Sequence, residues 1–147
     1  MDVPAPQPAL PCICARVRRT ARRVSQIYDR HLAAFGLTIS QFGILGQIRS
    51  AGSPSIGEMA ARMVMDPTTL TRSLRPLQQR GYVVLAADSQ DRRTRRLALT
   101  EAGLAALRQA RPGWAAAQDE VRLALGEEAS GALVARLDDT LSRLSPP

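Results

Sequence analysis

A long amphipathic segment runs from Cys12 to Phe35. Bulky and apolar side chains recur there at steps of three and four residues, which places them on one face of a helix, with the arginines on another. The inner face holds Val17, Ala21, Val24, Tyr28, His31 and Phe35, and the outer face holds Arg19, Arg23 and Arg30. Residues 1–11 contain four prolines, and we expect them to form a flexible N-terminal arm.

Two short helices are predicted next from their N-terminal caps. Thr38 with Gln41, and Ser55 with Glu58, have the spacing of a capping box, in which two side chains satisfy each other's backbone amides. Apolar residues follow each cap at helical spacing, and Gly52 lies where the first of these helices should end.

A fourth helix is predicted from Asp66 to Arg80. Asp66 is a good cap, and Pro67 suits the first helical position because no amide hydrogen is needed there. Leu70, Leu74 and Leu77 should point inward, and Gly81 should end the helix. The outer face and its flanks then carry Thr68, Thr69, Thr71, Arg72 and Arg75. With the preceding short helix, this segment predicts a helix-turn-helix.

A β-hairpin follows, because residues 82–87 and 94–99 are rich in apolar and β-branched side chains on either side of a polar link. Leu97 and Leu99 should pack inward, while Arg93 at the tip is held out. Such a hairpin beside a helix-turn-helix is a wing.

The C-terminal part is predicted to be helical. Thr100 should cap a helix, with a break or strong kink at Pro112-Gly113. The last helix carries Leu133, Leu137, Leu141 and Leu144 on one stripe. Together with the first helix, this stripe suits a dimer interface.

These elements predict a mainly α fold with a small β-hairpin wing. At 147 residues one domain is expected, covering 12–147. Its winged helix-turn-helix lobe would span about 38–100, and its dimerisation helices about 12–35 and 101–145.

The charge distribution favours a polyanionic partner. The net charge is +7, and all 20 basic residues are arginine. Residues 16–30 and 66–96 hold six and seven arginines, whereas residues 119–147 hold three against six acids. Few aromatic residues are present, which favours duplex over single-stranded nucleic acid.

Other function classes have little support in the sequence. There is one histidine, no glycine-rich phosphate loop and no metal-ligand cluster, so we expect no enzyme, no cofactor and no metal site. No apolar run is long enough to cross a bilayer and the N-terminus does not resemble a secretion signal, so we expect a cytoplasmic protein.

The chain resembles the MarR (multiple antibiotic resistance regulator) family of bacterial transcription regulators. The resemblance covers roughly residues 15–145. It is carried by Leu37-Thr38 with Gln41, by the segment from Met65 to Arg72, and by Asp91-Arg92-Arg93 followed by Leu99-Thr100-Glu101-Ala102-Gly103.

This resemblance implies a homodimer that binds a palindromic operator in double-stranded DNA. Arg93 would enter the minor groove, Asp91 would orient Arg93 by ion pairing, and the fourth helix would meet the major groove. The candidate DNA-binding residues are Pro67, Thr68, Thr69, Thr71, Arg72, Arg75, Asp91, Arg92 and Arg93. It further implies a repressor that a small aromatic or phenolic acid releases.

Candidate residues for such a ligand are fewer and less specific. An apolar cleft with an arginine at its mouth would suit an aromatic carboxylate. The residues considered are Arg19, Arg23, Tyr28, His31 and Trp114, each of which could instead be a core or interface residue.

Two alternatives remain open. Cys12 and Cys14 are expected to be buried or half-buried thiols near the dimer interface, but nearby arginines could make one of them a redox switch. The chain could also be a winged-helix module that binds proteins rather than DNA.

Overall fold

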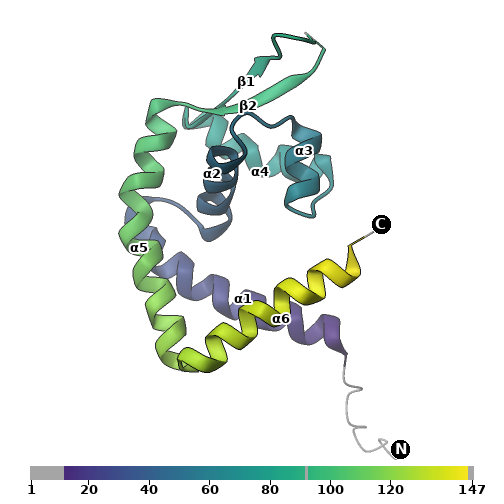
Figure 1. The fold of residues 1–147 in the computed structure, drawn as a ribbon. Helices are drawn as coiled ribbons and strands as arrows, with labels where there is room; N and C mark the ends of the chain where they lie inside the picture. The colour runs from purple at the N-terminus through teal and green to yellow at the C-terminus, as the bar shows by residue number, and fades with distance from the viewer. Residues whose placement is uncertain (1–11, 92, 146–147) are drawn as a thin grey trace, which may run out of the picture.

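The computed structural model describes residues 12–91 and 93–145. Its helices and its two-stranded hairpin confirm the predicted fold class (Figure 1). The predicted arm, residues 1–11, lies outside the described residues. In chain order the elements are α1 (Ile13–Leu32), the 3-10 helix η1 (Ala33–Phe35), α2 (Ile39–Ala51), α3 (Ile56–Arg62), α4 (Pro67–Gln79), β1 (Val83–Ala87), β2 (Arg95–Leu99), α5 (Glu101–Leu125) and α6 (Glu127–Leu144).

Side-chain caps begin the short helices where the sequence predicts them. The Thr38 hydroxyl accepts from the Gln41 amide at 3.2 Å, and the Gln41 side chain accepts from the Thr38 amide at 3.1 Å. Ser55 and Glu58 form the same reciprocal pair at the start of α3. Both capping boxes are therefore confirmed, and they fix where the helix-turn-helix begins.

One apolar core lies beneath the helix-turn-helix and the hairpin. Leu70, Leu74 and Leu77 of α4 are at most 1% exposed, and Leu97 of β2 is fully buried. Side chains from α1, α2, α3, β1 and α5 belong to the same cluster, among them Leu32, Leu45, Met59, Val83 and Leu107. The inward direction predicted for the α4 leucines and for Leu97 is confirmed, and Gly81 ends α4 with a φ of 71°.

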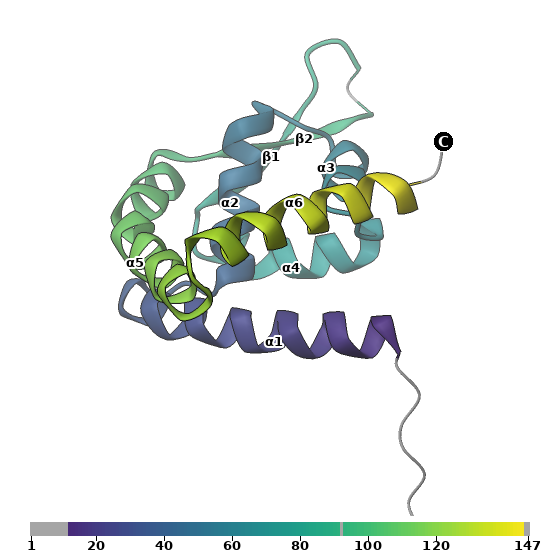
Figure 2. The ribbon, with the colours of Figure 1, turned by 60° about the horizontal axis from the view of Figure 1, so that its bottom comes forward.

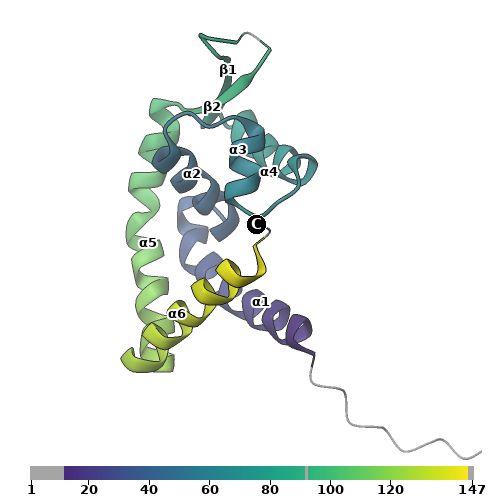
Figure 3. The ribbon, with the colours of Figure 1, turned by 45° about the vertical axis from the view of Figure 1, so that its right-hand side comes forward.

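The wing is an antiparallel hairpin whose register runs from Val83 opposite Leu99 to Ala87 opposite Arg95. Its second strand is joined to the segment before α3. The Leu97 amide donates to the Pro54 carbonyl at 2.8 Å, and Ser55 forms a bridge with Arg96. The hairpin extends from the lobe on the side remote from α1 and α6 (Figures 1 and 3).

The helices α1, α5 and α6 form the other part of the molecule. The second half of α1 packs along α5, while α6 and the first half of α1 project from α5 toward the same side (Figures 1 and 2). Within the described part of the chain, no residue of α6 is buried.

The break that Pro112-Gly113 predicts, as the alternative to a strong kink, does not occur, because α5 continues from Glu101 to Leu125 through both residues. Pro112 is exposed, so its ring faces solvent. Gly113 is buried, and a Cβ built there would lie 2.5 Å from the Phe35 ring and 2.8 Å from the His31 carbonyl oxygen. The close packing of α5 on α1 and η1 at this position therefore requires glycine.

Gly113→Ala should destabilise the protein by about 1–3 kcal/mol, because the added methyl group overlaps backbone and ring atoms. The matched control is Gly43→Ala in α2, where a Cβ would meet nothing within 4 Å. This substitution should increase the stability of the protein by up to about 1 kcal/mol, because alanine has a higher helix propensity than glycine. Urea unfolding followed by circular dichroism measures both. Equal stability of the two variants would show that the α1–α5 approach is not limited by Gly113.

Candidate nucleic-acid interface

The start of α4 is held by Asp66. One carboxylate oxygen accepts from the Thr69 amide at 2.9 Å, and the other accepts from the Thr69 hydroxyl. These bonds hold the pKa of Asp66 below its usual range, and the bond from the Thr69 hydroxyl contributes most. The cap is therefore an ionised carboxylate at neutral pH, which also suits the positive end of the helix.

The outer face of α4 carries a stripe of exposed side chains at helical spacing. Thr68, Arg72 and Arg75 are four and three residues apart and all exposed. Among the described residues, their side chains make no hydrogen bond or ion pair. Pro67 is exposed at the first position of the helix. The stripe is free to contact a ligand outside the chain.

Two of the other candidate threonines already make bonds inside α4. The Thr69 hydroxyl donates to Asp66, and the Thr71 hydroxyl donates to the Pro67 carbonyl at 2.8 Å. Each hydroxyl oxygen can still accept a hydrogen bond. Their first role is to shape the first turn of the helix, and DNA contact by either remains a prediction.

The tip of the wing is organised by Asp91. Its carboxylate accepts from the Arg93 amide at 3.0 Å and from the Thr94 hydroxyl at 3.0 Å. No ion pair joins Asp91 to the Arg93 guanidinium in the described part of the chain, so the expected ion pairing is replaced by a turn in the backbone. Arg93 is exposed. Arg92, also a candidate, lies outside the described residues.

Trp114, a candidate ligand-binding residue, lines a pocket between α2 and α5. The pocket has a volume of about 300 Å³. Its floor includes Phe42, whose ring stacks on Trp114 with centroids 6.2 Å apart and planes 14° apart. The remaining lining residues are Gly46, Arg49, Leu107, Arg108 and Arg111. An apolar floor with guanidinium groups beside it suits a small aromatic anion.

The other four ligand candidates do not line that pocket. The Tyr28 hydroxyl donates to Gln118, and burial raises the pKa of Tyr28. His31 Nε2 lies 2.7 Å from Glu120 Oε2. The side chains of Tyr28 and His31 therefore join α1 to α5. Arg19 and Arg23 are exposed on the first part of α1.

The three arginines of the α2–α5 pocket were missed in the sequence. A signal for them exists, since Phe42 and Arg49 are seven residues apart, and Arg108, Arg111 and Trp114 follow one another at steps of three. Each set shares a helical face, but the sequence does not show that the two faces meet.

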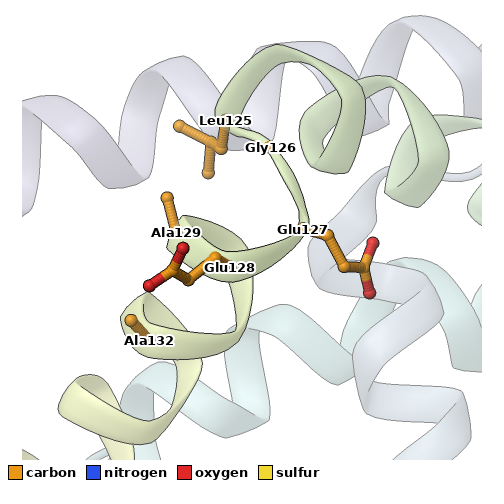
Figure 4. A pocket seen from close by; sticks show the side chains of 6 residues that line it. All are labelled: Leu125, Gly126, Glu127, Glu128, Ala129 and Ala132. Atoms are coloured by element: carbon orange, nitrogen blue, oxygen red, sulfur yellow. The ribbon is translucent and has the colours of Figure 1, made fainter.

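A second hollow lies where α5 meets α6, around Gly126 (Figure 4). Leu125, Glu128, Ala129 and Ala132 lie on one side of the turn, whereas Glu127 points to the other. This hollow is mostly apolar and open, and the exposed Leu125 lies on its wall.

Both cysteines are exposed in the single chain, so its own packing does not bury these thiols, and their burial near a dimer interface stays a prediction. They are exposed because the first turn of α1 projects beyond α5. The Cys12 sulfur caps this helix by accepting from the Ala15 amide at 3.4 Å. Within residues 12–91 and 93–145, no helix is long and apolar enough to cross a bilayer, and no cluster of three metal-ligating side chains occurs.

Comparison with known proteins agrees with this arrangement. The sequence pattern of the MarR family matches residues 35–94, from the end of η1 through the tip of the wing. The chain belongs to the MarR family. An uncharacterised HTH-type transcriptional regulator of Bacillus cereus is 34% identical over 100 residues, which cover 68% of this chain and 66% of that relative. The match thus spans slightly less than two thirds of the curated relative.

Solved structures of MarR-type regulators have the same fold. The transcriptional regulator MosR of M. tuberculosis, in complex with DNA, is 36% identical with a TM-score of 0.77, covering 92% of this chain and 99% of that one. A mutant of MarR from E. coli complexed with operator DNA is 22% identical with a TM-score of 0.80, covering 88% and 93%. The second likeness concerns the fold alone. The relatives of this MarR-family chain are transcription regulators, not enzymes.

Asp66→Ala should lower the melting temperature at pH 7, because the amides of the first turn of α4 lose their acceptor. The pKa of Asp66 is lowered on folding, so its stabilisation is complete above the ordinary carboxyl pKa of about 3.9 and is lost as the pH falls through the lower pKa of the folded protein. The difference from wild type should therefore narrow in acid. Asp66→Asn, which keeps an acceptor, is the control, and a pH-independent difference would contradict the ionised cap.

Proposed function

We propose that the chain is a dimeric, ligand-responsive repressor that binds a palindromic operator in double-stranded DNA. Residues 12–147 would form one domain. Its winged helix-turn-helix lobe, about 38–100, would bind DNA, and the helices in about 12–35 and 101–145 would form the dimer. The exposed stripe Thr68, Arg72 and Arg75, in the same lobe as the exposed Arg93, is the observation that carries this proposal.

The two parts of the lobe suit different parts of a duplex. An α-helix fits the major groove, where a guanidinium can bond to both acceptors of a guanine. A hairpin tip that carries the exposed Arg93 fits the narrower minor groove, whose negative potential attracts arginine. The structure of the 36% identical MosR in complex with DNA supports duplex DNA as the partner. Pro67, Thr69, Thr71, Asp91 and Arg92 would complete the interface.

Exposed apolar side chains support the dimer. On α6, Leu133, Leu137, Leu141 and Leu144 are 38% to 78% exposed, and Ile13 and Val17 on α1 are also exposed. An isolated chain would leave this apolar surface in water, which favours covering it with a second copy.

Charge complementarity indicates which helices would meet. The segment 13–23 at the start of α1 contains five arginines and no acid, whereas residues 127–144 contain four acids and two arginines. Pairing α1 of one protomer with α6 of its partner would place opposite charges beside the shared apolar stripe.

The pocket between α2 and α5 is our proposed effector site. Phe42 and Trp114 offer aromatic surface, and Arg49, Arg108 and Arg111 offer charge. A hydroxybenzoate-sized molecule could lie against the rings while its carboxylate bonds to a guanidinium. Because α2 belongs to the DNA-binding lobe and α5 links it to the dimer helices, a ligand there could change how the two lobes are spaced. Of the ligand candidates from the sequence, this proposal keeps Trp114.

Thiol oxidation is a second candidate signal, favoured by the exposure of both cysteines. It would act at the start of α1, next to the proposed dimer contact. Arg19, Arg23, Tyr28 and His31 lie on the same helix and remain candidates for a site that the dimer would complete.

Arg72→Ala should relax sequence preference and cost about 1–3 kcal/mol on the preferred duplex if the side chain bonds to a base. Arg93→Ala should instead weaken binding to preferred and unrelated duplexes alike and lower the salt slope by about one. Fluorescence anisotropy titrations over a range of salt concentrations measure both effects. Absence of salt-dependent duplex binding by the wild type would favour a protein-binding module.

Leu137→Asp with Leu141→Asp should give monomer or aggregate and abolish operator binding. Each buried leucine is worth about 1.5–3 kcal/mol, and a charge in its place adds a desolvation cost. Light scattering measures the oligomeric state, with the exposed Thr140→Ala as the control. A monomeric wild type at micromolar concentration, or full affinity of the double variant for a palindrome, would contradict the dimer.

Benzoate and hydroxybenzoates should raise the melting temperature, because a ligand at 100 times its Kd adds about 2.7 kcal/mol of stability. Arg108→Gln with Arg111→Gln should remove this shift, whereas Arg18→Gln should keep it.

The Cys12→Ser, Cys14→Ser variant separates the ligand signal from the thiol-oxidation signal. If the variant still releases DNA with these acids but no longer with peroxide, both signals operate. If peroxide still releases the variant from DNA, the hypothesis of thiol oxidation as a signal is wrong.

A further inference from the structure

Arg96 on β2, opposite Ala86 near the tip end of the hairpin, reaches three segments of the chain. Its side chain is only 34% exposed. The guanidinium Nε donates to the Asp88 carboxylate, while Nη1 donates to the Ser53 carbonyl at 2.9 Å and to Glu58 Oε2 at 3.2 Å. One side chain thus joins the wing, the loop after α2 and the first turn of α3.

Each partner of Arg96 is itself fixed in place. Asp88 is 9% exposed in its side chain, and its other oxygen accepts from the Gln90 amide at 2.7 Å. The Asp88 amide donates to the Thr94 carbonyl at 3.0 Å, directly below the tip. Glu58 also caps α3 through the Ser55 amide at 2.7 Å. The contacts of Arg96 therefore end on segments that determine where the tip and α3 begin.

The electrostatics of the cluster keep all three groups charged. Bonds from the Gln90 amide and from Arg96 lower the pKa of Asp88, and the bond to Asp88 raises the pKa of Arg96. Glu58 has a lowered pKa, first through the Ser55 amide and also through Arg96. Two carboxylates around one guanidinium leave the Arg96 side chain with no spare positive charge.

Arg95 provides the contrast on the same strand. Successive side chains of a strand point to opposite faces, and Arg95 is exposed. No hydrogen bond or ion pair of its side chain is found among the described residues. The two neighbouring arginines carry the same charge but only Arg96 is engaged within the protein.

We infer that Arg96 is a positioning residue for DNA binding, which clamps the wing to the start of α3 and does not itself bind DNA. The clamp, Arg96 with Asp88, Glu58 and the Ser53 carbonyl, sets the orientation of the tip relative to the helix-turn-helix. This inference rests on the proposed DNA-binding function. It assigns an acidic residue, Asp88, a favourable role beside a polyanion.

Asp88→Asn tests the clamp against simple electrostatics. An amide has one acceptor oxygen where the carboxylate has two, so it can keep the Gln90 turn but loses the ion pair with Arg96. Removing a negative charge near DNA should strengthen binding if charge alone matters. The clamp requires the opposite: affinity for the duplex that the wild type selects from a random DNA pool should fall by about tenfold, as expected for contacting residues that act as a unit.

Arg96→Gln and Arg95→Gln complete the experiment, because they remove equal charge from adjacent positions. Arg96→Gln should lower the affinity for the selected duplex by about tenfold. On a random duplex, Arg96→Gln should lower the affinity no more than Arg95→Gln does. The Asp88→Asn, Arg96→Gln double variant should bind no more weakly than the weaker single variant. Melting curves and circular dichroism confirm that each variant is folded.

Three results would overturn the clamp. Binding by Asp88→Asn that equals or exceeds the wild type would show that Asp88 acts only through its charge. An equal loss by Arg96→Gln on both duplexes, with a salt slope reduced by about one, would make Arg96 a phosphate contact. If the wild type itself does not prefer the selected duplex, both the clamp and the proposed function are wrong, whereas the first two results leave the proposed function intact.

Discussion

Four leucines, three from α4 and one from β2, belong to a single apolar core, and the relation between helix and wing depends on that shared packing. Leu70, Leu74, Leu77 and Leu97 are at most 1% exposed. Each contributes about 1.5–3 kcal/mol by leaving water, so neither element can shift without exposing or straining the other. A pair of surfaces meant for one duplex needs such a common base, since a small change in spacing would separate their contacts.

The net positive charge matters less than how the arginines are used. Arg62 bonds to Gln47 and Ser50, and Arg80 bonds to the Gly36 carbonyl and the Tyr82 hydroxyl. These guanidinium groups hold the lobe together. Arg72, Arg75 and Arg93 are exposed on α4 and at the wing tip, where hydrogen-bonding capacity is left for a partner. Composition favours a polyanion, but only the distribution of engaged and unengaged arginines indicates which surface would bind it.

The fold could be predicted closely because its boundaries are local. Thr38, Ser55 and Asp66 cap helices with partners three residues away, so the signal lies within one short segment. What could not be predicted depends on distant contacts. Pro112 favours a break, yet α5 is continuous there and packs closely on α1 and η1 at Gly113.

Two further features of the lobe also escape local rules. Val64, in the turn before α4, has a φ of 52°, which β-branched residues rarely adopt. The amides of Val64 and Met65 donate there to the Ala61 and Ala60 carbonyls at 3.1 and 2.9 Å. In the candidate site, too, some features follow from local sequence and others from contacts between distant segments. The stripe on α4 follows from helical spacing, whereas the partners of Arg96 and the arginines near Trp114 come from elements far apart in sequence.

In the proposed complex, α4 and the wing of one lobe contact the same duplex together. Footprinting by hydroxyl radicals and by base methylation, on the duplex selected by the wild type, can distinguish the two contacts. We expect, in each half-site, protected guanines in one major-groove segment and a protected adjacent minor-groove segment, with the minor-groove protection lost in Arg93→Ala. Protection of one groove alone, or minor-groove protection that persists in Arg93→Ala, would contradict this arrangement.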